Sequence, residues 1–172
     1  MASIPPIALH PSSENRGLVE RVVLAETRSP AFSSYTAALA RQSMEWMAIV
    51  LYNRRDNPSL YGASGPNLQA VVTAPGQFAG FGNYPTLAST VQARIDDILR
   101  IANNNSDSRS TAYRNHVQMA LDIGNLGSSI QSRNPSPGPL AFWRTDGSSP
   151  PGGRAVLYRD NLLGNDFYYT GP

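Results

Sequence analysis

The chain has 172 residues, 41% of them hydrophobic and 15% charged, which is the composition of one folded domain rather than of a disordered or coiled-coil chain. It contains no cysteine and no lysine, which excludes disulfides, thiolate metal sites, Schiff-base catalysis and a Walker-type phosphate loop. The fourteen basic residues are arginines scattered along the chain, and the net charge of +2 indicates no nucleic-acid surface; no apolar run predicts a membrane span.

The N-terminal part of the chain predicts an extended arm and two helices. Residues 1–13 contain three prolines and no sustained period, which favours an extended arm. Residues 14–28 carry apolar side chains at helical spacing. Residues 36–54 are apolar nearly all round, which is typical of a helix buried in the centre of a bundle. An Asp-Asn-Pro sequence at 56–58 ends this second helix.

The middle of the chain predicts further helices joined by loops. A loop with glycine, serine and proline at residues 59–66 precedes a short helix at 67–73. Two helices follow at 85–103 and 108–123. Because only a short polar segment joins them, we expect these two helices to form an antiparallel pair.

The C-terminal third predicts a loop and then strands. Glycine, proline and serine dominate residues 127–153, so we expect a long ordered loop there, interrupted by the apolar segment 140–143. Residues 155–158 and 167–169 predict short strands that return to the helices. The expected fold class is mainly α, of the α+β type. The expected organisation is an extended arm at 1–13 and a single domain at 14–172.

Glu26 is the most informative residue for function. It lies on the face that the first helix should bury, where an ionised carboxylate costs several kcal/mol unless it is paired or protonated. It also lies in the last helical turn, where the helix dipole disfavours a negative charge, and both effects raise the pKa of a carboxyl group. A neutral glutamic acid can act as a general acid on a glycosidic oxygen. The alternative is an ion pair with Arg28, Arg54 or Arg55.

Two more polar residues stand where a buried or tightly turned chain is expected. Asn53 lies on the apolar stripe of the helix at 36–54 and must find hydrogen-bond partners there. Gln77, between Gly76 and Phe78, projects from a tight turn. Each alone is more often a structural hydrogen-bonding residue, but with Glu26 they suggest one shared groove.

These segments resemble a known family in their order and spacing. Glu26 at the end of an apolar helix, the segment Met-Ala-Ile-Val-Leu-Tyr-Asn-Arg at 47–54 and Pro-Gly-Gln-Phe at 75–78 resemble the cell-wall hydrolase family typified by spore-cortex-lytic enzymes. Residues 163–168 are similar to the family's closing Gly-x-His-x-Phe-Tyr, with Asn165 or Asp166 near the place of its histidine. The resemblance covers residues 18–84 and 140–169.

The resemblance implies a lysozyme-like helical domain that cuts peptidoglycan between N-acetylmuramic acid and N-acetylglucosamine. Glu26 would be the general acid, and in a lytic transglycosylase it also acts as the base. The expected sugar-binding residues are Asn53, Gln77, Phe78, Trp143 and Tyr168. Of the aromatic ones, Phe78 and Trp143 are flanked by glycine and proline in loops, where binding residues concentrate.

Two alternatives remain at this point. A hydrolytic muramidase would need a second carboxylate, and the available residues are Asp56, Asp146, Asp160 and Asp166. A non-catalytic module would instead bind glycan or serve as a structural part of a phage or secretion assembly.

No metal or cofactor is expected, because His10 and His116 are isolated from ligand-spaced carboxylates. The start of the chain lacks the features of a secretory signal, so we expect synthesis in the cytoplasm and action in the periplasm or cell wall. Delivery as a phage endolysin or as an antibacterial toxin of type VI secretion fits this expectation. The expected partners are peptidoglycan strands, a secretion-machine carrier and an immunity protein that plugs the groove, with no nucleic acid and no membrane insertion.

Overall fold

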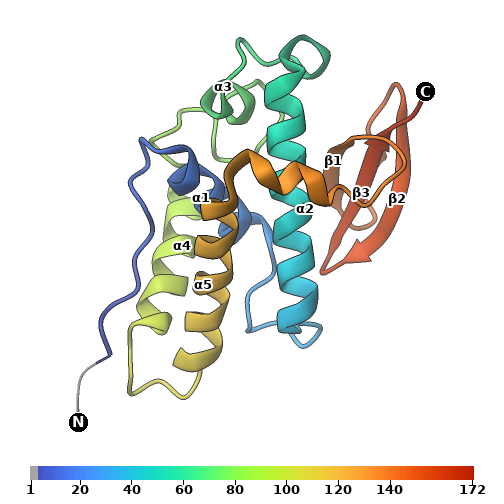
Figure 1. Cartoon of the computed structure of the whole chain (residues 1–172). Coiled ribbons are helices and arrows are strands. Elements are labelled where there is room, and N and C mark those ends of the chain that lie inside the picture. The colour runs from blue at the N-terminus through green and yellow to red at the C-terminus, as the bar shows by residue number, and fades with distance from the viewer. Residues whose placement is uncertain (1–3) are drawn as a thin grey trace.

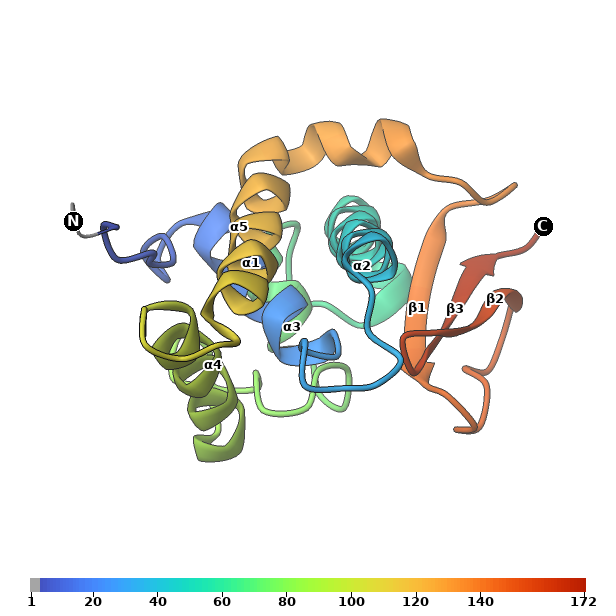
Figure 2. The same cartoon turned by 90° about the horizontal axis from the view of Figure 1, so that it is seen from below.

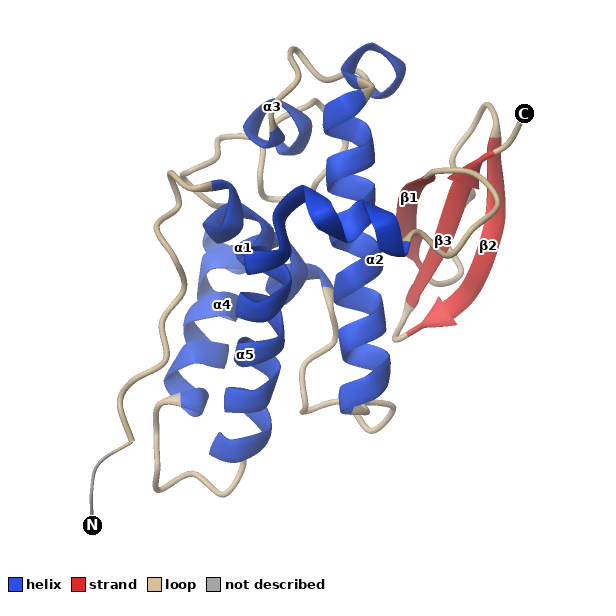
Figure 3. Cartoon of the chain, in the orientation of Figure 1, coloured by secondary structure: helices blue, strands red, loops and turns tan. Residues whose placement is uncertain are grey.

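The computed structural model describes residues 4–172 as a mixed α+β domain (Figure 1). The α-helices are α1 (Asn15–Glu26), α2 (Ala37–Asp56), α3 (Leu68–Val72), α4 (Ser89–Ala102) and α5 (Ser110–Leu126). Two 3-10 helices are η1 (Pro58–Tyr61) and η2 (Gly127–Arg133). The strands are β1 (Leu140–Thr145), β2 (Ala155–Leu162) and β3 (Asn165–Thr170), all in the C-terminal segment (Figure 3).

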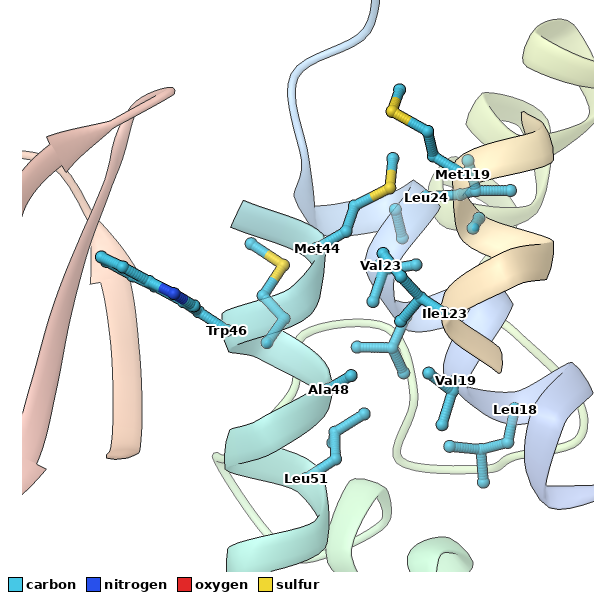
Figure 4. Packing of buried hydrophobic residues seen from close by; sticks show 14 of the residues in the cluster. Leu18, Val19, Val23, Leu24, Met44, Trp46, Ala48, Leu51, Met119 and Ile123 are labelled. Carbon is cyan, nitrogen blue, oxygen red and sulfur yellow. The ribbon is translucent and has the colours of Figure 1, made fainter. Parts of the chain in front are cut away.

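Helix α2 runs through the centre of the molecule. Helices α1, α4 and α5 lie on one side of it and the sheet lies on the other, as the view along α2 shows (Figure 2). In Figure 4, Met44 and Leu51 of α2 point toward α1 and α5, whereas Trp46 points toward the sheet. The Trp46 ring packs edge-on against Phe167 of β3 at 5.3 Å between centroids. The prediction of a central buried helix is confirmed for residues 46–54, all of which are buried, whereas Arg41 and Gln42 nearer its start are exposed. The helix lies between a helical layer and the sheet rather than inside a helical bundle.

The helix boundaries follow local sequence signals. Thr36 caps the start of α2, because its side chain accepts a hydrogen bond from the Leu39 backbone N–H at 3.2 Å. Asn67 caps α3 in the same way, through the Ala70 N–H at 2.8 Å. Helices α4 and α5 pack side by side as the expected pair (Figures 1 and 2). Within the described residues, no helix combines the length and apolar character that a membrane span requires.

The expected loop at 127–153 is wrong in two places. Residues 127–133 form η2, which crosses beside α2 and carries the chain from α5 to the sheet (Figures 1 and 2). Residues 140–145 form β1, whose first two residues, Leu140 and Ala141, are fully buried. The strand exists because it pairs with β3, a distant partner that no local pattern reveals.

The sheet is antiparallel in the order β1-β3-β2. The two expected strands are present and longer than predicted. Strands β2 and β3 form a hairpin whose turn residues Leu163 and Gly164 both have positive φ, 50° and 84°. Positive φ at both central residues is the hairpin geometry that matches the twist of the flanking strands. This tight turn brings Asn165, the first residue of β3, next to the end of α1.

The N-terminal arm is extended, as predicted, and it is docked along the helices; residues 1–3 lie outside the described part. The Ile7 backbone exchanges two hydrogen bonds with the Asn103 side chain, at 2.7 and 2.9 Å. His10 donates its backbone N–H to Glu20 at 2.8 Å, and its ring nitrogen Nδ1 lies 2.5 Å from the same carboxylate. Glu20 is fully buried in α1, so the arm supplies the partner that this buried carboxylate needs.

Candidate functional site

Glu26 lies between two adjoining hollows on the surface. The first, of about 210 Å³, is lined by Glu26, Arg54, Gly76, Gln77, Phe78, Ala79, Phe142, Trp143, Arg144 and Thr145. The second, of about 170 Å³, is lined by Glu26, Arg28, Phe32, Arg94, Thr145, Leu163, Gly164 and Asn165. Because Glu26 and Thr145 belong to both linings, the two hollows adjoin at these residues and together make up a groove.

The end of α1 places Glu26 at this position. The next residue, Thr27, leaves the helix with an extended backbone (φ −87°, ψ 137°) and is itself buried, with its hydroxyl 3.5 Å from the Met47 sulfur. Asn165 donates its side-chain amide to the Glu26 backbone carbonyl at 3.3 Å, which ties the hairpin turn to the helix end. The carboxyl group therefore stands at the negative end of the helix dipole.

The surroundings of Glu26 favour its protonated form. Burial raises the pKa of Glu26, while the hydrogen bond from Trp143 and the charge of Arg94 lower it, and the balance remains above the ordinary value. The Trp143 Nε1–H donates to Glu26 Oε2 at 3.3 Å. The Arg94 guanidinium binds the backbone carbonyl of Ala25.

The expected alternative, a structural ion pair of Glu26, is wrong. Among the described residues, no arginine nitrogen lies within 4.0 Å of the Glu26 carboxylate. Arg28 donates to the Ser34 hydroxyl at 3.3 Å, and Arg55 pairs with Asp56 at 2.7 Å. The third arginine, Arg54, is bound elsewhere in the first hollow, as described next.

Arg54 also lines the first hollow, although the sequence did not single it out as a site residue. Its Nε donates to the Ala141 carbonyl at 2.6 Å and its Nη1 to Gln77 Oε1 at 2.8 Å. The guanidinium also lies 4.7 to 5.4 Å from the ring centroids of Phe142, Phe78 and Tyr61. Burial lowers its pKa to about 10, with the nearby Tyr61 raising it and Arg144 lowering it. A charged residue in a helix that is apolar nearly all round was the signal that could have found it.

Three of the expected binding residues meet Glu26 in the first hollow, namely Gln77, Phe78 and Trp143. The rings of Phe78 and Trp143 lie 5.2 Å apart at a tilt of 59°. Trp143 therefore contacts both Phe78 and the carboxyl group of Glu26. This arrangement gives the groove an apolar wall beside an acid.

The other two expected binding residues, Asn53 and Tyr168, line neither hollow. Asn53 donates its side-chain amide to the Leu140 carbonyl at 2.9 Å and accepts a hydrogen bond from Gln131 at 3.0 Å. It therefore joins α2 to the start of β1. Tyr168 lies in the middle strand, opposite Phe142 and Leu157, and is only 4% exposed.

Comparison with protein-family models, with curated proteins and with solved structures gave no match.

No second carboxylate reaches the groove from the described residues. The four aspartates considered from the sequence, Asp56, Asp146, Asp160 and Asp166, are absent from both linings. Asp166, the residue next to Asn165, instead accepts the Asn161 backbone N–H at 2.9 Å. Likewise, no cluster of three or more His, Asp or Glu side chains that could hold a metal ion occurs in residues 4–172.

Proposed function

We propose that this protein cleaves the glycan strand of peptidoglycan between N-acetylmuramic acid and N-acetylglucosamine, as a lytic transglycosylase with a lysozyme-like fold. The observation that carries the proposal is the position of Glu26, partly exposed between two adjoining hollows and with a raised pKa. An acid that borders two hollows can act on a bond between two sugar residues, one in each hollow. The helical layer, the small sheet and the acid at a helix end are consistent with a lysozyme-like architecture.

The chemistry requires Glu26 to give up a proton and then take one back. The protonated carboxyl donates to the glycosidic oxygen, and the bond from that oxygen to C1 of the muramic acid breaks with its electron pair going to the oxygen. The carboxylate then accepts the proton of the C6 hydroxyl while O6 bonds to C1 and closes a 1,6-anhydro ring. The Trp143 N–H and the Arg94 charge stabilise the carboxylate between these two steps, because both favour the ionised form.

The groove favours transglycosylation over hydrolysis. Hydrolysis with two carboxylates needs a second group to activate water or to form a covalent intermediate, at about 5 to 9.5 Å from the first. Within residues 4–172, Glu26 supplies the only carboxyl group in either lining. A ring closure by the substrate's own hydroxyl needs only one.

In this proposal the protein acts in the periplasm or cell wall, where its substrate is. It reaches that compartment as an endolysin or as an effector toxin. In the second case the producing cell needs an immunity protein, and a partner that covers Glu26 and Trp143 would block both hollows at once.

The test is cleavage of purified sacculi by the wild type, by Glu26→Gln and by Asp97→Asn, a control that removes an exposed carboxylate of α4. We expect the wild type and the control to clear the suspension and Glu26→Gln to be inactive. Mass spectrometry should show products ending in 1,6-anhydromuramic acid, lighter by one water than reducing-end products. Products with reducing ends would instead show that the protein hydrolyses the glycosidic bond. Undiminished clearing by Glu26→Gln, or none by the wild type, would contradict the proposal.

A further inference from the structure

Arg54 carries a buried positive charge with no anion beside it. The residue is 5% exposed, and no carboxylate among the described residues lies within 4.0 Å of its guanidinium. Six other arginines of the chain do have such a partner: Arg16, Arg41, Arg55, Arg100, Arg109 and Arg133. A buried charge costs several kcal/mol unless it is paired, so this one needs a reason.

The guanidinium also has unused hydrogen-bonding capacity. Its five N–H groups can all donate, yet only Nε and Nη1 do so, to Ala141 and Gln77. The Nη2 group has no acceptor in the described part of the chain. Within residues 4–172, the fully buried side-chain nitrogen and oxygen atoms without a hydrogen-bond partner are Ser43 Oγ and His116 Nε2. The unpartnered Nη2 of Arg54 is not one of them, so this atom is accessible to solvent. Arg54 lines the first hollow, which is where this group can meet a ligand.

The rest of the hollow strengthens the positive field. Arg144, exposed on β1, lines the same space, and its charge acts on Arg54. The one acidic group in the lining is Glu26, which contributes no negative charge while it is protonated. The first hollow therefore presents two cations and an acid to whatever enters it, which favours an anionic ligand group.

We propose that Arg54 forms a carboxylate subsite for the 3-O-lactyl group of muramic acid. This inference rests on the proposed function and specifies its substrate: strands whose muramic acid carries a free carboxylate close to the cleaved bond. Arg54 and Glu26 line the same small hollow, so the carboxylate must belong to the sugar that the acid acts on or to a group attached to it. The lactyl ether meets this condition once the stem peptide has been removed. A carboxylate within the stem peptide is the other source of the same chemistry.

The subsite would also decide which sugar occupies the first hollow. N-acetylglucosamine has no acidic substituent and would leave the Arg54 charge unpaired, whereas muramic acid would pair it. A hydrogen bond to a charged group contributes about 1.5 to 3 kcal/mol, which corresponds to at least about a tenfold difference in affinity.

The test measures binding, so it does not depend on cleavage. The probes are the disaccharide N-acetylglucosaminyl-N-acetylmuramic acid, its lactyl methylamide, and the same disaccharide carrying a dipeptide stem with one free carboxylate. The indole N–H resonance of Trp143, which lines the hollow, reports each Kd. We expect the free acid to bind at least about tenfold more tightly than the methylamide at constant salt.

Variants locate the effect. Arg54→Gln should abolish the preference for the acid, and Arg144→Gln, a substitution at an exposed position, should reduce it. Arg159→Gln, which removes an exposed charge of β2 outside both hollows, should retain it. If Arg54→Gln does not fold, the comparison of acid and methylamide on the wild type still decides whether the protein prefers a free carboxylate.

Each outcome has a distinct meaning. Tight binding of the dipeptide probe relative to the methylamide supports the subsite and assigns the carboxylate to the stem. Equal affinities for all three probes, or no measurable binding of any of them, would overturn the subsite even if sacculi are cleaved. Selective binding without 1,6-anhydro products would leave the subsite in place and refute the proposed reaction instead.

Discussion

Acid should destabilise this protein through one buried histidine. His116 of α5 is fully buried, its Nδ1 lies 3.3 Å from the Tyr35 hydroxyl, and its Nε2 has no partner among the described residues. Burial lowers its pKa from an ordinary 6.5 to about 4. Between these two pH values the unfolded chain binds a proton that the native protein does not bind, so the free energy of unfolding falls as the pH falls. At about 1.4 kcal/mol per unit, the loss attributable to His116 amounts to about 3 kcal/mol.

Urea unfolding of the wild type and of His116→Gln at pH 7 and pH 4 measures this contribution. The variant cannot titrate at this position, so it should lose about 3 kcal/mol less than the wild type over that interval. Met119→Leu, a change in a buried residue of the same helix, controls for altered packing and should lose as much as the wild type. The reasoning is refuted if the wild type and His116→Gln lose the same free energy.

Three further predictions concern stability. Asn53→Ala should lower the free energy of unfolding by about 1 to 3 kcal/mol, because the Leu140 carbonyl loses its donor, and an unchanged urea midpoint would argue against that role. Gly17→Ala should lower the Tm although alanine favours helices, because a Cβ at this position would lie 2.1 Å from the Pro11 carbonyl oxygen; a raised Tm would mean that the arm does not press on α1. Glu26→Gln should be more stable than the wild type at pH 7, and calorimetry should show this gain shrinking toward pH 4. The sign follows because a raised pKa makes the native protein lose stability as the pH rises above about 4.5, so a wild type that is the more stable at pH 7 would contradict it.

The helical part of the fold was accessible from the sequence because its signals are local. The apolar side chains on nearly all sides of α2 predicted a central helix. Both faces are apolar because Trp46 packs toward the sheet and Met44 packs toward α1 and α5. Glu26 was conspicuous for the same reason, as a carboxylate on a face that is otherwise buried.

Strand β1 and the position of Arg54 in the groove could not be predicted, because both depend on long-range contacts that local sequence patterns do not reveal. Strand β1 lies in a segment rich in glycine and proline, and it is a strand only because β3 pairs with it. Asn53 and Arg54 are adjacent polar residues near the end of α2, and successive helical positions point about 100° apart. Which of the two lines the groove depends on where β1 packs, and the sequence does not show this. Asn53 was therefore predicted as a binding residue, whereas Arg54 is the one that lines the first hollow.

The most direct test of this account is the titration of the Glu26 carboxyl group itself. The 13C carboxyl resonance of Glu26, identified by its absence from Glu26→Gln, should be followed against pH in the wild-type protein. The account predicts a midpoint clearly above the ordinary value of 4.5, because burial disfavours the ionised form. A midpoint at or below that value would mean that the group is ionised when it meets its substrate, and it could not then serve as the proton donor.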